Sequence, residues 1–234
     1  MTDLAGLRAR IRALEGAGAG EGGVWPLGAS ALDGALPGGG LARAAVHEVV
    51  PARTGWDDGP AAGFALALAG RALAHAEGPV LWVARRLDLY PPGIAAFGVP
   101  PERLLCARAP DDAGVLWALE EALRCPALAA VVGEAEQLSR TPVRRLQLAA
   151  EAGGVTGLLL QRRRIPPTRA EPSAAVTRWR VGALPRTSLT SGPRWRVELA
   201  RVRGGLPSEF EVIWDDTTGR FAVAAPLRDR AAAV

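Results

Sequence analysis

The chain has 234 residues, of which 49% are apolar, and this combination favours one large globular domain over a disordered chain. Its 28 basic residues are all arginine and outnumber 24 acidic residues, so the net charge is +4 and acidic partners such as nucleic acid suit its surface. No uncharged run approaches the roughly 20 residues that cross a bilayer, and the N-terminal segment is charged throughout. We therefore expect no membrane insertion and no export, and a cytoplasmic location.

The first predicted element is a helix over residues 1–15. Its apolar residues recur at steps of three and four and form one narrow stripe, made of Leu4, Leu7, Ile11 and Leu14. A stripe this short does not stabilise a helix alone in water, so we expect it to dock on its own domain or on another molecule. The glycine-rich residues 16–23 are predicted to be a flexible linker. The main domain is expected over residues 24–227, and residues 228–234 are expected to form a disordered tail.

The middle of the chain alternates between strand and helix signals. The segment "VWPLGASALDGALPGGGLARAAVHEVV" predicts a helical turn capped by Ser30, then a Pro-Gly-Gly-Gly turn and a strand ending near Val50. Further strands are expected over 79–84, 103–108, 127–133 and 155–161, with helices over 60–76, 111–124 and 139–152 and a short one over "PPGIAAFG". The helix at 60–76 has Pro60 at a favourable first position. Uninterrupted apolar strands between helices predict a parallel sheet that is covered on both faces.

The pattern changes after residue 165. The segments "SAAVTRWRVGAL", "PRWRVELARVRGG", "EFEVIWDD" and "RFAVAAP" alternate polar and apolar residues between glycine, proline and aspartate turns. Such alternation predicts antiparallel strands that extend the sheet.

The order of these pieces resembles the RecA core over about residues 25–165. The segment "PLGASALDGALPGGGLARAAVHEV" is similar to the part that leads into that family's phosphate loop, and "VLWVARRLDLYPPGIAAFGV" to the unit that follows. "LAAVVGEAEQL" resembles the Walker B strand, and "GLLLQRR" the strand whose last glutamine senses the nucleotide. The resemblance implies an α/β fold with a RecA-like core, that is, a mostly parallel central sheet flanked by helices and extended here by C-terminal antiparallel strands.

The residues that would perform ATP chemistry depart from that pattern. Phe64 and Ala65 replace the lysine that holds the phosphates and the hydroxyl that binds Mg²⁺, and the chain has no lysine at all. Gly133 stands at the Walker B aspartate and Arg85 at the glutamate that activates water, and only Gln161 matches. Hydrolysis needs charge neutralisation, a bound metal and an oriented nucleophile. We therefore expect no cofactor and no enzymatic activity, with Phe64 packed in the core beneath the first helix of the domain.

Among RecA-like sequences that lack these residues, the chain resembles the ImuA family most. The likeness extends to the C-terminus, where Arg-Trp pairs, an Arg-Gly-Gly turn and an acidic pair precede a last strand. The resemblance implies a bacterial, SOS-induced adaptor in translesion synthesis and mutagenesis. Its implied partners are ImuB, an inactive Y-family polymerase homologue, and RecA, with an error-prone replicative-type polymerase contacted indirectly and DNA as a further candidate.

Two groups of residues are candidate binding sites. Arg162, Arg163, Arg164 and Arg169 fall in a proline-rich loop where the RecA core has its second DNA-binding loop, and guanidinium groups there suit phosphate contacts. The alternative is a solvated loop without function. Partner binding is assigned to the N-terminal stripe and to Trp195 and Trp214, because tryptophan beside arginine is common at interfaces. The alternative for the tryptophans, as for Trp179, is packing of a sheet face.

Two other functions stay open at this level. One is a cell-division inhibitor of the SulA kind, which likewise has a RecA-like core without ATP residues. The other is a weak RecA-like ATPase that uses residues outside the familiar motifs. Recovery of a division GTPase in a pull-down would favour the first, and nucleotide binding at millimolar ATP and Mg²⁺ would favour the second.

Overall fold

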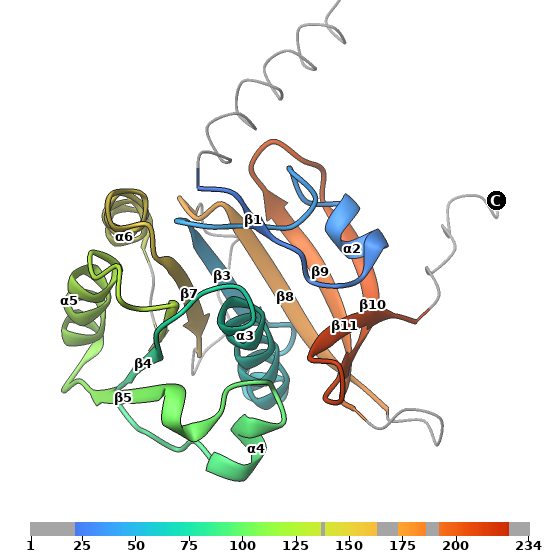
Figure 1. Cartoon of the computed structure of the whole chain (residues 1–234), viewed down its shortest axis with the longest axis horizontal. Helices are drawn as coiled ribbons and strands as arrows, with labels where there is room; N and C mark the ends of the chain where they lie inside the picture. Colours follow the sequence, from blue (N-terminus) through green and yellow to red (C-terminus); the bar gives the residue numbers. More distant parts are fainter. Residues whose placement is uncertain (1–21, 137–138, 163–172, 186–191, 225–234) are drawn as a thin grey trace, which may run out of the picture.

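The computed structural model describes residues 22–136, 139–162, 173–185 and 192–224, and its centre is a nine-stranded sheet (Figure 1). The strands run in the order β11-β10-β9-β8-β3-β7-β6-β4-β5. Their bounds are β3 Val46–Pro51, β4 Val80–Ala84, β5 Leu104–Arg108, β6 Ala130–Ala135, β7 Thr156–Gln161, β8 Thr177–Leu184, β9 Arg194–Val202, β10 Ser208–Asp215 and β11 Arg220–Val223. A separate two-stranded sheet pairs β1 (Val24–Trp25) with β2 (Leu41–Ala42).

Strands β3 to β7 pair in parallel, and β9, β10 and β11 continue the sheet in antiparallel pairs. The predicted fold class is therefore confirmed. One detail differs, because β8 was expected among the antiparallel strands and instead pairs in parallel with β3 while β9 runs antiparallel to it. Strand β8 therefore begins at the same edge of the sheet as β3, opposite to the edge at which β7 ends.

Helices cover both faces of the sheet, as uninterrupted apolar strands require. Helices α3 (Asp58–Leu73), α4 (Pro91–Ala95) and α2 (Ser30–Gly34) pack with one face, and α5 (Asp112–Leu123) and α6 (Arg140–Gly153) lie together on the other (Figure 1). The two faces form two separate apolar clusters. None of the described helices is long and apolar enough to span a bilayer.

The ends of the helices show which local signals in the sequence hold. Asp111 caps α5 by accepting a hydrogen bond from the amide of Gly114 at 2.8 Å, as acidic residues at a helix start do. Ser30 does not cap α2, whose N-cap is Ala29, and the carboxylate of Asp33 instead accepts the amides of Leu27 and Gly28. The predicted serine cap was therefore wrong.

The arginine and tryptophan pairs of the C-terminal strands separate onto opposite faces of the sheet. On β8 the Trp179 side chain is buried while Arg180 is exposed, and on β9 Trp195 is buried while Arg196 is exposed. This is the period of two that strands impose on side chains. The tryptophans thus enter the core under α3, and the arginines line the solvent face with acidic neighbours such as Glu198.

The predicted domain bounds are only partly within the described residues. The helix at 1–15, most of the linker at 16–23, and the tail at 228–234 lie outside them, so the stripe of Leu4, Leu7, Ile11 and Leu14 stays a prediction.

Candidate functional site

The carboxyl ends of the parallel strands, where open α/β sheets bind their ligands, bring four charged residues together. Asp58 begins α3, Asp88 follows β4, Glu134 lies near the end of β6 and Arg162 follows β7. These residues come from four separate segments of the chain, and the parallel topology alone places them side by side. A nucleotide would bind at this edge in a RecA-like ATPase.

The segment that should form the phosphate loop is helical in this chain. Helix α3 begins at Asp58, so Gly63, Phe64 and Ala65 lie in its second turn and not at its N-terminus. Amides beyond the first turn of a helix are bonded to carbonyls within the helix, and they are not free to bind phosphate. The predicted helix start at Pro60 was two residues late.

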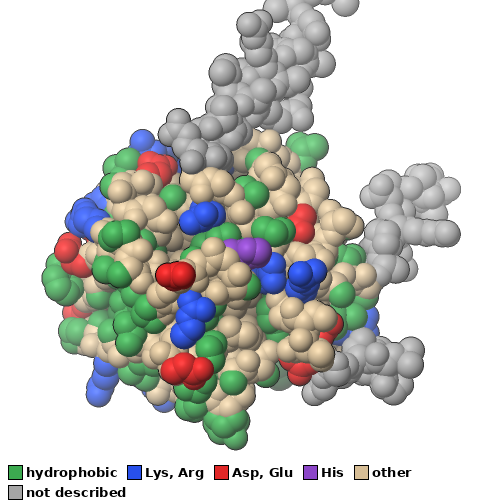
Figure 2. Space-filling view, viewed as in Figure 1, with side chains coloured by type: hydrophobic (Ala, Val, Ile, Leu, Met, Phe, Trp, Pro, Cys, Tyr) green, Lys and Arg blue, Asp and Glu red, His purple; other side chains and the backbone are tan. Residues whose placement is uncertain are grey.

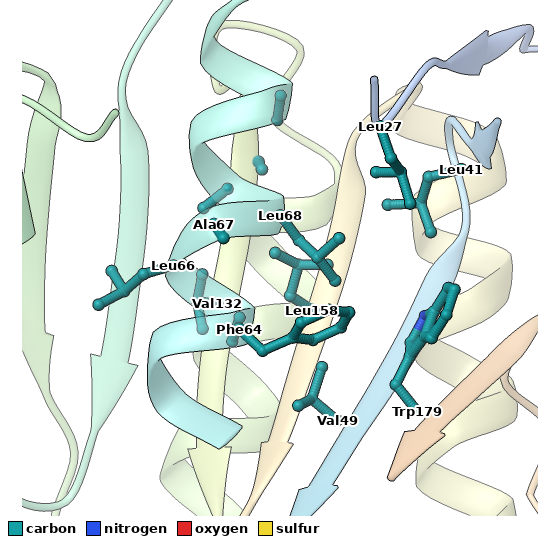
Figure 3. Packing of buried hydrophobic residues seen from close by; sticks show 14 of the residues in the cluster. Leu27, Leu41, Val49, Phe64, Leu66, Ala67, Leu68, Val132, Leu158 and Trp179 are labelled. Atoms are coloured by element: carbon teal, nitrogen blue, oxygen red, sulfur yellow. The ribbon is translucent and has the colours of Figure 1, made fainter. Parts of the chain in front are cut away.

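Phe64 points into the core from α3, as expected, and is fully buried (Figure 3). Its ring lies 5.6 Å from Trp179, 5.8 Å from Trp195 and 5.3 Å from Phe221, measured between centroids. These partners belong to β8, β9 and β11. The residue at the position of the phosphate-binding lysine therefore packs α3 against the C-terminal strands.

In the loop between β3 and α3, the carboxylate of Asp57 takes the place that a bound anion could occupy. The carboxylate of Asp57 accepts the amide of Arg53 at 3.0 Å and the amide of Ala183 at 3.1 Å, and it forms two contacts of 2.9 and 3.1 Å with the Arg53 guanidinium. Its side chain is 1% exposed. Hydrogen bonding to Arg53 holds the pKa of the Asp57 carboxyl below its usual range. An internal carboxylate thus occupies the hydrogen-bond donors that Arg53 of this loop and Ala183 of β8 present here.

The Walker B position is closed by packing. Gly133 is buried in β6, and a Cβ atom placed there would lie 2.2 Å from Cδ1 of Leu119 on α5. No aspartate fits unless that leucine moves. Nearby, the Arg85 guanidinium lies 3.1 Å from Glu136 and 3.7 Å from Asp112, so the residue at the position of the catalytic glutamate is an ion-pair partner.

Arg162 lies inside the carboxylate cluster and not on an open surface. Its Nη1 is 2.8 Å from Glu134 and 3.4 Å from Asp88, and its Nε is 4.0 Å from Asp58. Burial raises the pKa of the Glu134 carboxyl, and the nearby charge of Arg162 opposes this shift while that of Asp88 adds to it. Three carboxylates around one guanidinium leave little positive charge to attract phosphate.

The remaining predicted site residues are placed as follows. Arg163, Arg164 and Arg169 lie outside the described residues, so their DNA contact stays a prediction. Gln161, the one match to the RecA pattern, is 6% exposed at the end of β7. Trp195 and Trp214 are 3% and 1% exposed within the core, as the packing alternative expects, and their role in partner binding stays a prediction.

Sequence reasoning did not find the apolar groove beside the charged cluster. This groove has a volume of about 500 Å³ and is bounded by α3, α4, the segment after β4 and the adjacent ends of β8 and β9. Four of its residues are the cluster residues Asp58, Asp88, Glu134 and Arg162. Because the walls come from segments over a hundred residues apart, only the hydrophobic "LDLY" turn (87–90) gave any local signal.

Charge is not gathered into one patch on the face seen in Figure 2, where acidic, basic and apolar side chains are interspersed. Among the described residues, no group of three or more histidine, cysteine, aspartate or glutamate side chains has the arrangement of a metal site. The carboxyl edge therefore offers ion pairs and an apolar groove as its distinguishing chemistry.

Comparison with known proteins gives one strong relationship. The chain is 41% identical over 196 residues to Protein ImuA of Caulobacter vibrioides, in strain NA1000 / CB15N and in strain ATCC 19089 / CIP 103742 / CB 15, and the match covers 79% of this chain and 80% of the relative. No family model matches the chain. The crystal structure of SulA from Pseudomonas aeruginosa is 24% identical with a TM-score of 0.42, and it covers 50% of this chain and 96% of that chain. That structural likeness is too slight to bear on function.

Proposed function

The chain belongs to the ImuA family, and from this we propose that it is a non-catalytic RecA-like adaptor in SOS-induced translesion synthesis and mutagenesis. Its partners in this proposal are ImuB and RecA, with the error-prone replicative-type polymerase joined indirectly and DNA as a further ligand. The family resemblance supplies the partners, and the geometry of the carboxyl edge supports the absence of catalysis.

One observation carries the proposal, namely that internal contacts fill three places where a RecA-like ATPase holds its nucleotide: the phosphate-binding lysine, the Walker B aspartate and the loop before α3. Phe64 packs against three aromatic rings, Leu119 fills the space beside Gly133, and the Asp57 carboxylate accepts the amide of Arg53 in the loop before α3 and the amide of Ala183 on β8. Each replacement stabilises the fold in a different way. An ATPase that had lost a single residue would keep a vacant site, whereas this edge is rebuilt around internal contacts.

The rebuilt edge is also electrostatically unsuited to triphosphate. Asp57 and Asp58 carry two carboxylates at the N-terminus of α3, which is the helix end that otherwise attracts anions. Asp88 and Glu134 add two more a short distance away, and the guanidinium groups of Arg53 and Arg162, which could attract phosphate, are already paired with these carboxylates. A fold that keeps its sheet and helices while losing this chemistry is suited to presenting surfaces to other proteins.

The experiment that tests the proposal measures nucleotide and partner binding with the full chain. Calorimetric titration with millimolar ATP and Mg²⁺ should show no saturable heat, and a phosphate-release assay should stay at background, with RecA as the positive control. Pull-down with the purified chain should recover ImuB and RecA. Saturable ATP binding with phosphate release would instead establish a weak ATPase, and recovery of a division GTPase without a polymerase homologue would establish a cell-division inhibitor.

A further inference from the structure

The groove at the carboxyl edge has an apolar body and an acidic end. Its apolar walls include Leu66, Leu89, Tyr90, Ile94, Leu184 and Trp195. Tyr90 is 71% exposed at the rim, whereas Ile94 and Trp195 are each 3% exposed and form the deeper wall. A mostly apolar hollow of about 500 Å³ with a few polar groups at one end has the size and composition of a binding site.

Glycine at position 63 contributes to the depth of this groove. A Cβ atom there would lie 3.2 Å from the Phe97 ring and 3.2 Å from the Trp195 ring. Glycine lets both rings pack directly against the backbone of α3, and Gly63, Phe97 and Trp195 all line the groove. The same aromatic layer continues to Phe64, so the wall is part of the rigid core.

The charge at the acidic end stands out against the basic chain. Asp58, Asp88 and Glu134 surround the guanidinium of Arg162. The same residues line an adjoining hollow with two further acids, Asp112 and Glu136, and three further arginines, Arg85, Arg86 and Arg108. Carboxylates therefore still outnumber guanidinium groups here, on a chain whose net charge is +4. The other arginine of the groove, Arg194, is 3.1 Å from Glu211 and is neutralised by it. Phosphate groups are repelled from such an end, and a basic side chain is attracted to it.

From these observations we propose that the groove binds a peptide segment of a partner protein, in which large apolar side chains lie next to an arginine or a lysine. The apolar side chains enter the groove over Ile94 and Trp195, and the basic side chain reaches the carboxylates of Asp88 and Glu134. In such an interface a few buried apolar residues and one charged pair contribute most of the binding energy. The inference goes beyond the proposed function, because it names a surface and its ligand chemistry and holds whichever protein supplies the segment.

Selection from random peptides tests the proposal without a known partner. The probe is a phage-displayed library of random dodecapeptides, selected on the immobilised full chain. We expect the recovered peptides to share at least two large apolar residues beside arginine or lysine and to bind more weakly at high salt. No enrichment, or enrichment of acidic peptides, would overturn the proposal.

Variants then locate the binding. Asp88 is 48% exposed and Tyr90 is 71% exposed, so Asp88→Arg and Tyr90→Ala should fold, which thermal unfolding checks. In fluorescence anisotropy each should weaken binding of a recovered peptide at least about tenfold, because one reverses the charge at the acidic end and the other removes rim area. The matched controls are Asp216→Arg and Leu148→Glu, at exposed positions outside the groove. Equal loss in controls and groove variants, or no loss in the groove variants, would refute the assignment.

Discussion

Replacing Phe64 by lysine restores the residue of an ATP-binding loop and should destroy stability without creating a nucleotide site. The Phe64 side chain is fully buried among the rings of Trp179, Trp195 and Phe221. Exchange of a core side chain for another of similar size costs up to about 1.5 kcal/mol, and burial of an unpaired ammonium adds several kcal/mol more. A total of about 4 kcal/mol corresponds to a fall in the melting temperature of about 8–16 °C for a chain of this size.

The variant Phe64→Met isolates the charge, because methionine fills the space without an ammonium group. The assay is thermal unfolding of both variants with and without ATP and Mg²⁺. Burial depresses the pKa of a lysine in the folded state below its unfolded value of about 10.4. The unfolded state then binds more protons, so the deficit of Phe64→Lys relative to Phe64→Met should shrink as the pH rises from 7 toward 10. A lysine variant that melts like the wild type, or one that ATP stabilises, refutes the reasoning.

Four further outcomes follow from the described contacts. Gly133→Asp should lose about 1–3 kcal/mol in urea unfolding, because its Cβ would lie 2.2 Å from Leu119. The same substitution should cost less in a Leu119→Ala background, and an equal cost in both backgrounds would show that the clash with Leu119 is not its cause. Burial is the main cause that lowers the pKa of His47 from 6.5 to about 4, so about 3 kcal/mol of stability is present above pH 6.5 and is lost as the pH falls toward 4. The free energy of unfolding should therefore depend less steeply on pH in His47→Gln than in the wild type, and an unchanged dependence would contradict the assignment. If the chain binds DNA, the binding should keep its salt dependence in Arg162→Ala, because three carboxylates already neutralise that guanidinium. A slope of log K against log salt concentration that is smaller by about one would instead show that Arg162 contacts a phosphate. Asp57→Ala frees two amides and a guanidinium, so millimolar sulfate should raise the melting temperature of the variant and not of the wild type, and an equal response of both would argue against an internal anion.

The sequence predicts the order of strands and helices well, because each buried strand is an uninterrupted apolar run and each helix has a periodic apolar face. It also predicts the burial of Phe64, since a phenylalanine in an apolar helix has no other favourable place. The first residue of a helix is predicted less accurately than its presence. Pro60 marks a favourable first position, yet α3 begins at Asp58, because the first turn of a helix tolerates proline at more than one place.

The chemistry of the carboxyl edge was harder to predict, since it depends on residues far apart in the chain. The DNA-contact hypothesis for Arg162, which stays a prediction, rests on the place of its loop in the RecA pattern and on the arginines beside it in the sequence. Its partners Asp88 and Glu134 are 74 and 28 residues away, and they meet it only because β4, β6 and β7 end at one edge. The direction of β8, which pairs in parallel with β3, is likewise not encoded by the alternation of polar and apolar residues.

The measurement that tests the central claim most directly is the affinity of the full chain for ImuB with and without ATP and Mg²⁺, with phosphate release followed in the same samples. If the nucleotide site has been replaced by internal contacts, complex formation should have one dissociation constant under both conditions, and phosphate should stay at background. Binding that strengthens with ATP, or phosphate release that rises with the complex, would contradict a non-catalytic adaptor.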